Sequence, residues 1–281
     1  MYNSQITRAN KGAFILLLDR SGSMAEQTIL NGNVMTKAQA LADVVNSLLT
    51  ELINRCRKER FIGDYFDVAI IGYSGDEADS LLGSGWQSIV DIDSMATDIT
   101  RHRLERRLPD GTAYATIVDR RAWIKPCAKG RTPMAKALSS ATRLASSWCR
   151  KHPLSFPPIV INISDGEATD SSHEQIAQLA DKLKAISTSD GNVLLMNIHL
   201  SGQYDNEECS LRFPSEREAL SLGRHAKLLF NISSTLPELY NQEIEEFTGA
   251  KPPFRAICYN APIDELVSLL AIGSLTMDRM I

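Results

Sequence analysis

Short runs of apolar residues divide the chain, and polar residues follow each run. The runs occupy residues 13–18, 66–73, 159–163, 193–200 and 228–232. None of them alternates cleanly between apolar and polar positions, as a strand with one solvated face would. They therefore predict five strands that are buried on both faces of a parallel sheet.

Amphipathic helical patterns separate the apolar runs. Apolar residues recur at steps of three and four, and a hydroxyl residue that can cap the first helical turn precedes four of the patterns. The predicted helices begin at Thr36, Thr132, Ser172 and Ser215, and two more cover residues 236–247 and 262–275. Strands alternating with helices predict right-handed crossovers. The expected fold is α/β: a doubly wound, Rossmann-like, mostly parallel sheet with helices on both faces.

The segment of about residues 75–131 interrupts this alternation, because it contains no strong helical stripe. Residues 101–108 and 112–121 flank the turn sequence Pro109-Asp110-Gly111, which predicts a β-hairpin. Another short strand is expected near residues 86–92. We therefore expect an ordered insertion beside the sheet.

Oxygen-bearing side chains follow two of the predicted strands and precede one helix. Asp19, Ser21 and Ser23 come directly after the first strand, Asp165 follows the third strand, and Thr132 begins a helix. The carboxyl ends of parallel strands meet at one edge of a sheet, where open α/β folds bind ligands. Carboxylate and hydroxyl oxygens suit a hard cation such as Mg²⁺. These five residues are therefore predicted to form a metal site, on an exposed edge of the sheet.

The order Asp-x-Ser-x-Ser, Thr-Pro-Met and Ser-Asp-Gly-Glu resembles the von Willebrand factor A (vWA) domain with an intact metal-ion-dependent adhesion site (MIDAS). The resemblance implies that Ser21 and Ser23 ligate Mg²⁺ directly, with Mn²⁺ or Ca²⁺ as alternatives. It implies further that Asp19, Thr132 and Asp165 contribute directly or through water. The sixth ligand would be a carboxylate from a partner protein.

The resemblance extends over about residues 13–248, and we expect the chain to form a single vWA domain over residues 1–281. The chain departs from the family in the hairpin-containing insertion at about 75–131 and in a C-terminal extension at about 249–281. The stretch from Trp123 to Met134 is similar to bacterial intracellular members. Some of these act beside kinases, phosphatases or ring-shaped AAA ATPases in stress or defence systems.

The function implied by the resemblance is a non-catalytic, Mg²⁺-dependent protein–protein interaction module that binds an Asp or Glu carboxylate of a partner. The charges agree with it, since two carboxylates nearly neutralise a divalent ion and leave it able to attract another anion. The helix that begins at Thr132 is expected to direct its N-terminal amides towards that anion.

Composition restricts the compartment and the class of partner. The formal net charge of -4 gives no overall basis for binding nucleic acid or an anionic membrane. Five scattered cysteines without a Cys-x-x-Cys pair favour a reducing compartment. The first residues lack a signal-peptide pattern, and no apolar segment approaches the ~20 residues of a membrane helix. We therefore expect a cytoplasmic protein.

Two alternative functions stay open at this point. The first is a Mg²⁺-dependent hydrolase or phosphotransferase that uses Asp19, at the end of a strand, as its nucleophile. Against it, Ser21 stands where such phosphatases carry a second Asp, and the sequence has no glycine-rich phosphate cradle. The second is nucleic-acid binding through the basic region at 101–131. Acidic residues reduce the positive charge of this region, however, and few aromatic residues alternate with its basic residues. A third possibility for this region is that its arginines steer an acidic partner to the metal.

Overall fold

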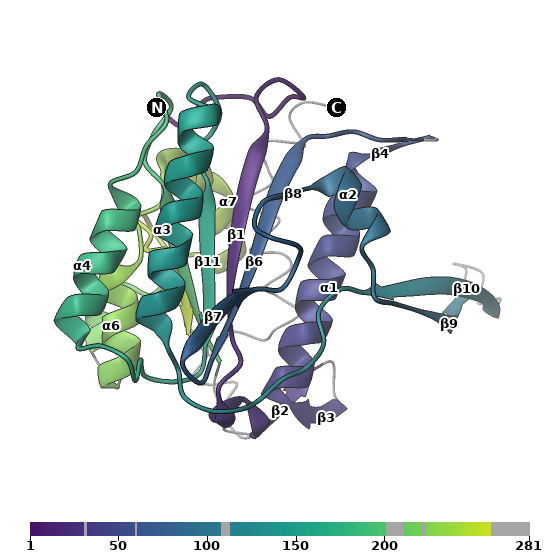
Figure 1. Ribbon diagram of the computed structural model, residues 1–281, viewed down its shortest axis with the longest axis horizontal. Helices are drawn as coiled ribbons and strands as arrows, with labels where there is room; N and C mark the ends of the chain where they lie inside the picture. The colour runs from purple at the N-terminus through teal and green to yellow at the C-terminus, as the bar shows by residue number, and fades with distance from the viewer. Residues whose placement is uncertain (31–32, 60, 108–112, 201–210, 221–222, 260–281) are drawn as a thin grey trace.

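A computed structural model describes residues 1–30, 33–59, 61–107, 113–200, 211–220 and 223–259 (Figure 1). One mixed sheet of eight strands forms its centre. These strands are β1 (Gly12–Asp19), β6 (Phe66–Ser74), β7 (Glu77–Ser80), β8 (Gln87–Ser88), β11 (Ile159–Ser164), β12 (Leu194–His199), β13 (Leu211–Arg212) and β14 (Ile257–Tyr259). Their order is β13-β14-β12-β11-β1-β6-β7, and β8 pairs with β6.

The five central strands are parallel, and the antiparallel pairings lie towards the two sides of the sheet. β1 pairs in parallel with both β6 and β11, and β12 continues the parallel arrangement to β14. β7, β8 and β13 pair in the antiparallel sense. The α/β, mostly parallel sheet predicted from the sequence is therefore confirmed, as are the strands predicted at 13–18, 66–73, 159–163 and 193–200.

Helices cover both faces of this sheet (Figure 1). Hydrophobic contacts place α1, α2 and α7 on one face and α3, α4 and α6 on the other. The helices are α1 (Lys37–Cys56), α2 (Ile89–Ser94), α3 (Met134–Lys151), α4 (His173–Lys184), α5 (Glu216–Leu220), α6 (Arg224–Ile232) and α7 (Asn241–Thr248), with 3-10 turns η1 (Gly22–Ala25) and η3 (Glu238–Tyr240). None of the described helices combines the length and the apolar character of a membrane-spanning segment.

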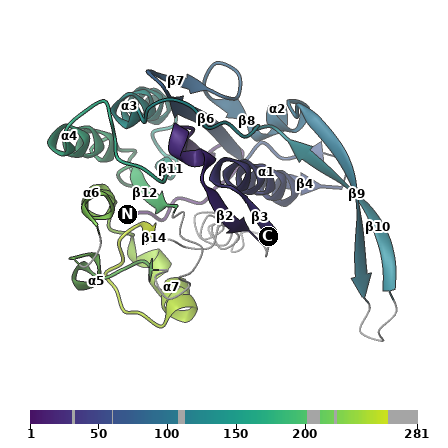
Figure 2. The same cartoon turned by 90° about the horizontal axis from the view of Figure 1, so that it is seen from below.

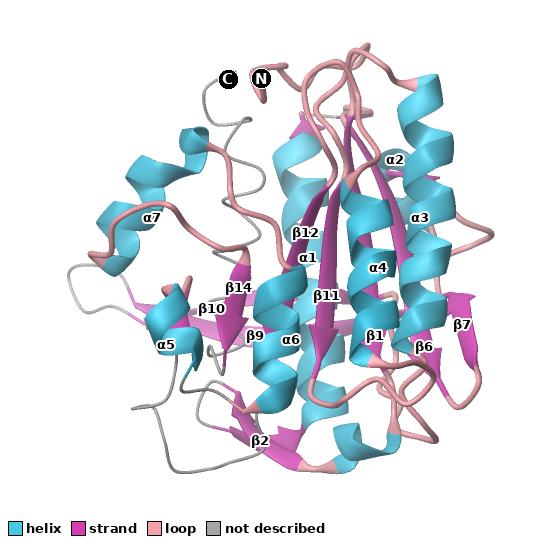
Figure 3. Cartoon of the chain, turned by 90° about the vertical axis from the view of Figure 1, so that its left-hand side faces the viewer, coloured by secondary structure: helices cyan, strands magenta, loops and turns pink. Residues whose placement is uncertain are grey.

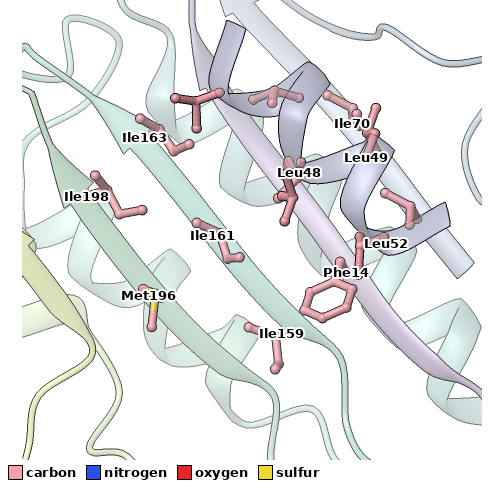
Figure 4. Close-up of a cluster of buried hydrophobic side chains, with 14 of the residues drawn as sticks. Phe14, Leu48, Leu49, Leu52, Ile70, Ile159, Ile161, Ile163, Met196 and Ile198 are labelled. Carbon is pink, nitrogen blue, oxygen red and sulfur yellow. The ribbon is translucent and has the colours of Figure 1, made fainter. Parts of the chain in front are cut away.

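The two-sided burial of β1 explains its unbroken apolar sequence. Phe14 and its alternate neighbours pack towards α1, whereas Ile15 and its alternate neighbours pack towards α3. Figure 4 shows Leu48, Leu49 and Leu52 of α1 lying over the central strands. Successive side chains of a strand point to opposite faces, so burial of both faces removes the need for polar positions.

Two predictions of local structure were wrong. Residues 228–232 belong to α6 and not to a strand. Ala226, Leu229 and Ile232 recur at helical spacing and are buried, and Leu229 and Ile232 pack in the hydrophobic cluster on this face of the sheet. The short strand expected near 86–92 is only the two-residue β8. Ser88 is the last residue of β8 and the N-cap of α2, where its side chain accepts a hydrogen bond from the amide of Val90.

The segment after residue 248 also contributes to the sheet. β14 lies within the predicted C-terminal extension, yet it pairs with β12 and β13. It continues the sheet beyond β12, and it is a strand that the sequence analysis did not predict. The helix predicted at 262–275 lies outside the described residues.

Three antiparallel hairpins complete the described structure. They are β2 (Gln27–Leu30) with β3 (Asn33–Thr36), β4 (Arg57–Lys58) with β5 (Phe61–Ile62), and β9 (Asp98–Arg107) with β10 (Ala113–Ala122). The last pair confirms the predicted hairpin of the insertion, whose turn lies outside the described residues. It projects from the body of the molecule beside α1 and α2 (Figure 2).

Candidate metal centre

The predicted metal residues gather at the carboxyl edge of the sheet, between β1 and β11. These neighbouring parallel strands continue in opposite directions, since β1 leads to α1 on one face and β11 leads to α4 on the other (Figure 3). Such a reversal opens a crevice between the strand ends, which is where open α/β sheets bind ligands.

Asp19 is the last residue of β1 and is fully buried. Its Oδ1 accepts a hydrogen bond from the Ser21 amide at 2.9 Å, and its Oδ2 accepts one from Ser164 Oγ at 2.7 Å. Burial raises the pKa of Asp19 to about 6; the hydrogen bonds from Ser21 and Ser164 oppose this shift, and the charge of Asp165 adds to it. The Asp19 carboxylate is therefore oriented, but its negative charge is incompletely compensated.

A chain of side-chain oxygens leads from the loop after β1 to the loop after β11. Ser21 Oγ lies 3.1 Å from Ser23 Oγ, and Ser23 Oγ donates a hydrogen bond of 2.7 Å to Asp165 Oδ1. The Asp165 side chain is fully buried. Four predicted residues, Asp19 included, thus form one continuous group.

Thr132 reaches this group through a loop that is tied to the one carrying the serines. The Gly22 amide donates to Gly130 O at 2.9 Å. A Cβ placed on Gly166 would lie 3.6 Å from Ser23 Oγ and 3.7 Å from Thr132 Oγ1, so both hydroxyls converge beside that glycine. Among the described residues, the Thr132 hydroxyl has no hydrogen-bond partner. The structure therefore brings together all five residues.

The tie between these loops depends on glycine at position 130. Gly130 has a φ of +70°, and a Cβ there would lie only 2.7 Å from the Cα of Gly75. A larger residue at position 130 would be strained in this conformation and would push the backbones of residues 75 and 130 apart.

Two expectations about the surroundings of the site were wrong. Asp19, Ser21 and Thr132 are almost fully buried, whereas Ser23 is only partly buried and Gly22 is exposed, so most of the group is recessed below the surface. Helix α3 begins at Met134, and the amides of Ala135 and Lys136 donate to the Asp170 carboxylate at 3.1 Å each. Asp170 already caps these amides, so they are not directed towards an incoming anion.

Three further residues belong to the surroundings of the site and were not predicted from the sequence: Ser164 and Lys37, which contact Asp19 and Asp165, and Glu26, which contacts Lys37. Ser164 could have been found, because the parallel register that pairs Leu18 with Ile163 puts Ser164 beside Asp19. Lys37 carried no such signal, since it opens a helix at a position that is usually solvated.

Lys37 is buried, with its side chain only 4% exposed. Its Nζ donates to Asp165 Oδ2 at 2.8 Å and to Glu26 Oε2 at 2.7 Å. Burial lowers the pKa of Lys37, but the two carboxylates outweigh burial, and the pKa is raised above its usual value. The lysine is therefore a fixed positive charge beside the predicted ligands.

The donor set fits a hard cation. Within the described part of the chain, no three His, Cys, Asp or Glu side chains are grouped so that they could hold a metal ion. An ion at this site would therefore depend on the hydroxyl oxygens of Ser21, Ser23 and Thr132 as well as on two carboxylates. An all-oxygen set of this kind suits Mg²⁺ better than softer metals.

The basic insertion makes ordinary surface contacts where its side chains are described. Arg121 forms an ion pair with Asp93, and Arg120 lies 3.5 Å from Asp43 of α1. Among the described strands, β9 and β10 pair only with each other. The hairpin projects beside α1 and α2, away from the ends of β1 and β11 (Figures 1 and 2). These contacts give no support to the idea that its arginines border the metal.

No family model matches this sequence, and no curated protein matches it. Among solved structures, similar folds include von Willebrand factor type A from Catenulispora acidiphila, with 11% identity, a TM-score of 0.49 and coverage of 95% of this chain and 42% of that chain. Proximal thread matrix protein 1 from the mussel byssus has 16% identity, a TM-score of 0.47 and coverage of 97% and 47%. This chain spans less than half the length of either protein. Likeness at this level says nothing about function, so any functional statement depends on the site itself.

Proposed function

We propose that the protein is a non-catalytic, Mg²⁺-dependent protein–protein interaction module of the vWA type. Asp19, Ser21, Ser23, Thr132 and Asp165 would hold the ion as a MIDAS, and an Asp or Glu of a partner protein would complete its coordination. Kinases, phosphatases and AAA ATPases of a cytoplasmic stress or defence assembly are the partners that the motif resemblance favours. The observation that carries the proposal is the convergence of these five oxygen-bearing side chains at the carboxyl ends of β1 and β11.

The surroundings of each residue support its role. Ser164 and the Ser21 amide hold both oxygens of Asp19, and Ser23 with Lys37 holds both oxygens of Asp165. Carboxylates that are fixed before binding lose little freedom when they bind an ion. The bound Mg²⁺ would supply an electrophilic centre for the partner's carboxylate.

The same geometry favours binding over hydrolysis. A nucleophilic Asp19 would have to present a carboxylate oxygen to a substrate, next to a positioned acid or base. Instead, Asp19 is fully buried, and both of its oxygens already accept hydrogen bonds.

The test compares capture of partners by the immobilised protein in Mg²⁺ and in EDTA, with calorimetric Mg²⁺ titration of the same samples. We expect the wild type to bind Mg²⁺ and to retain partners only in Mg²⁺. Asp19→Ala should weaken Mg²⁺ binding strongly and abolish the capture of these partners. Asp181→Asn is the matched control, because Asp181 is an exposed carboxylate of α4 that pairs only with Lys184 in the described structure.

Three results would contradict the proposal. The first is a wild-type protein that does not bind Mg²⁺. The second is partner capture that resists both EDTA and Asp19→Ala. The third is Mg²⁺-dependent release of phosphate from an aryl phosphate that is lost in Asp19→Ala, which would establish the hydrolase alternative.

A further inference from the structure

A buried lysine lies beside a site that is expected to bind a cation. Lys37 Nζ contacts Asp165 Oδ2, while the other oxygen of Asp165 accepts the hydrogen bond from Ser23. One carboxylate therefore separates the ammonium group from the hydroxyls that would hold the ion. Burying an ammonium group is costly unless opposite charges compensate it, so this position requires an explanation.

The backbone holds Lys37 in this place. The hairpin of β2 and β3 lies between η1 and α1, and the Lys37 amide closes it by donating to Glu26 O at 2.8 Å. The Thr36 hydroxyl caps the first turn of α1 by accepting from the Gln39 amide. The lysine therefore stands at a fixed junction and not at the end of a mobile loop.

We propose that Lys37 is a resident counter-charge that makes the metal site selective for an acidic partner. The inference rests on the proposed function. Asp19 and Asp165 together carry two negative charges, and Lys37 cancels one of them. A bound divalent ion then keeps a net positive charge of one at the site. Without Lys37 the two carboxylates would neutralise the ion, and it would attract a further carboxylate less strongly.

Glu26 does not cancel this effect. Its side chain is 62% exposed, whereas that of Asp165 is fully buried. Water and salt screen an exposed charge much more than a buried one. Lys37 therefore acts mainly on Asp165 and on the ion beside it.

The proposal predicts a gain of metal affinity when the lysine charge is removed. Lys37→Met keeps the length and apolar character of the side chain, so we expect Mg²⁺ to bind at least about tenfold more tightly, because a buried unit charge close to the ion no longer repels it. Damage to the site would have the opposite effect on affinity. The metal-free variant should also melt at a lower temperature, since Asp19 and Asp165 then face each other without a cation.

Acetate serves as the probe for the partner's carboxylate. In the wild type, acetate should strengthen Mg²⁺ binding, because the two ligands bind next to each other and each raises the affinity for the other. In Lys37→Met this enhancement should be smaller. Lys37→Arg keeps the charge and should restore the wild-type acetate effect.

Lys11→Met is the matched control. Lys11 lies just before β1, at the opposite edge of the sheet, and pairs with Asp64 at 2.6 Å and with Asp67 at 3.2 Å. Its removal should lower the melting temperature without changing Mg²⁺ affinity. If Lys37→Met does not fold without metal, Lys37→Gln removes the charge while keeping a hydrogen-bond donor, and the same titrations apply.

The outcomes separate the two proposals. If the wild type binds Mg²⁺, and folded Lys37→Met binds it equally or more weakly, or shows the same acetate effect, the counter-charge is disproved while the metal site stands. If only Lys37→Met binds Mg²⁺, the wild type has no metal site whose charge the lysine could adjust, and both proposals fail. If neither binds it, both proposals fail.

Discussion

Each edge of the sheet carries a lysine that is paired with two carboxylates, but the two clusters differ in charge balance. At the amino edge, Lys11 pairs with Asp64 and Asp67, and Trp148 Nε1 donates to Asp67 Oδ2 at 2.9 Å. At the carboxyl edge, Lys37 pairs with Asp165 and the exposed Glu26. There a third carboxylate, Asp19, is buried, and no cationic side chain among the described residues pairs with it.

The pKa shifts of two aspartates express this difference. Burial would raise the pKa of Asp64, but hydrogen bonds from Lys11 and Ser88 outweigh burial, and its pKa is lowered. Burial dominates at Asp19, whose pKa is raised to about 6. The charged form is thus stabilised at the amino edge and destabilised at the carboxyl edge. The first cluster needs nothing more, whereas the second would gain from an added cation.

The largest expected difference between the edges is in metal affinity. Asp19→Ala removes one of the two carboxylates available to an ion, so we expect Mg²⁺ affinity to fall by a factor of about 100 or more, following the charge–charge interaction at a buried site. Asp64→Ala, at the amino edge, should leave the affinity within about twofold of the wild type. Isothermal titration calorimetry measures both. Equal losses of Mg²⁺ affinity in the two variants would contradict a metal site at the carboxyl edge.

At the carboxyl edge, some residues of the site can be predicted from the sequence and others cannot. Asp19 and Asp165 were predictable because each follows an unbroken apolar strand, and adjacent parallel strands bring their carboxyl ends together. Lys37 was not predictable, since its burial depends on the hairpin of β2 and β3 and on an aspartate that lies 128 residues away. Asp170 is a similar case, because its role as the cap of α3 requires the fold.

The misassigned segment shows a second limit. Residues 228–232 are mostly apolar, and a run of five residues fits a strand or one turn of a helix equally well. Burial of Leu229 and Ile232 against the sheet favours the helix, and β14, which follows later in the chain, pairs with β12. The local sequence pattern predicts the central strands correctly. Whether residues 228–232 form a strand or a helix depends on contacts between distant segments of the chain.

The next largest difference concerns the stability of the metal-free protein. The folded pKa of Asp19, about 6, exceeds its usual value of 3.8. Its contribution to stability is complete below about pH 3.8 and is lost as pH rises through 6. At pH 7, Asp19→Asn should therefore stabilise the metal-free protein, by up to about 2–3 kcal/mol from the size of the shift.

The matched variant at the amino edge should behave oppositely. The pKa of Asp64 is lowered, so its contribution to stability is present above its usual pKa and is lost in acid. Asp64→Asn should therefore destabilise the protein at pH 7. Urea unfolding of both variants in EDTA, between pH 4 and pH 7.5, measures the effects. An Asp19→Asn protein that is less stable than the wild type at pH 7 would contradict the unequal charge balance of the two edges.

The smallest expected difference concerns the serines that orient the two aspartates. Ser164 Oγ donates to Asp19 at 2.7 Å, and Ser88 Oγ donates to Asp64 at 2.7 Å. Loss of a residue that orients a metal ligand costs about 10- to 100-fold in affinity. We expect Ser164→Ala to weaken Mg²⁺ binding by about tenfold, at the lower end of that range, because the Ser21 amide still holds the other oxygen of Asp19.

Ser88→Ala removes a hydrogen bond of the same length at the amino edge, together with the N-cap of α2. It should therefore destabilise the protein by about 1 kcal/mol and leave Mg²⁺ affinity unchanged. Calorimetric titration measures the Mg²⁺ affinity of the two variants, and urea unfolding measures their stability. Together they distinguish the orientation of a metal ligand from a general effect on stability. If Ser164→Ala lowers stability as Ser88→Ala does but leaves Mg²⁺ affinity intact, then Ser164 only stabilises the strand ends, and the ordered carboxylate of Asp19 is not what an ion would bind.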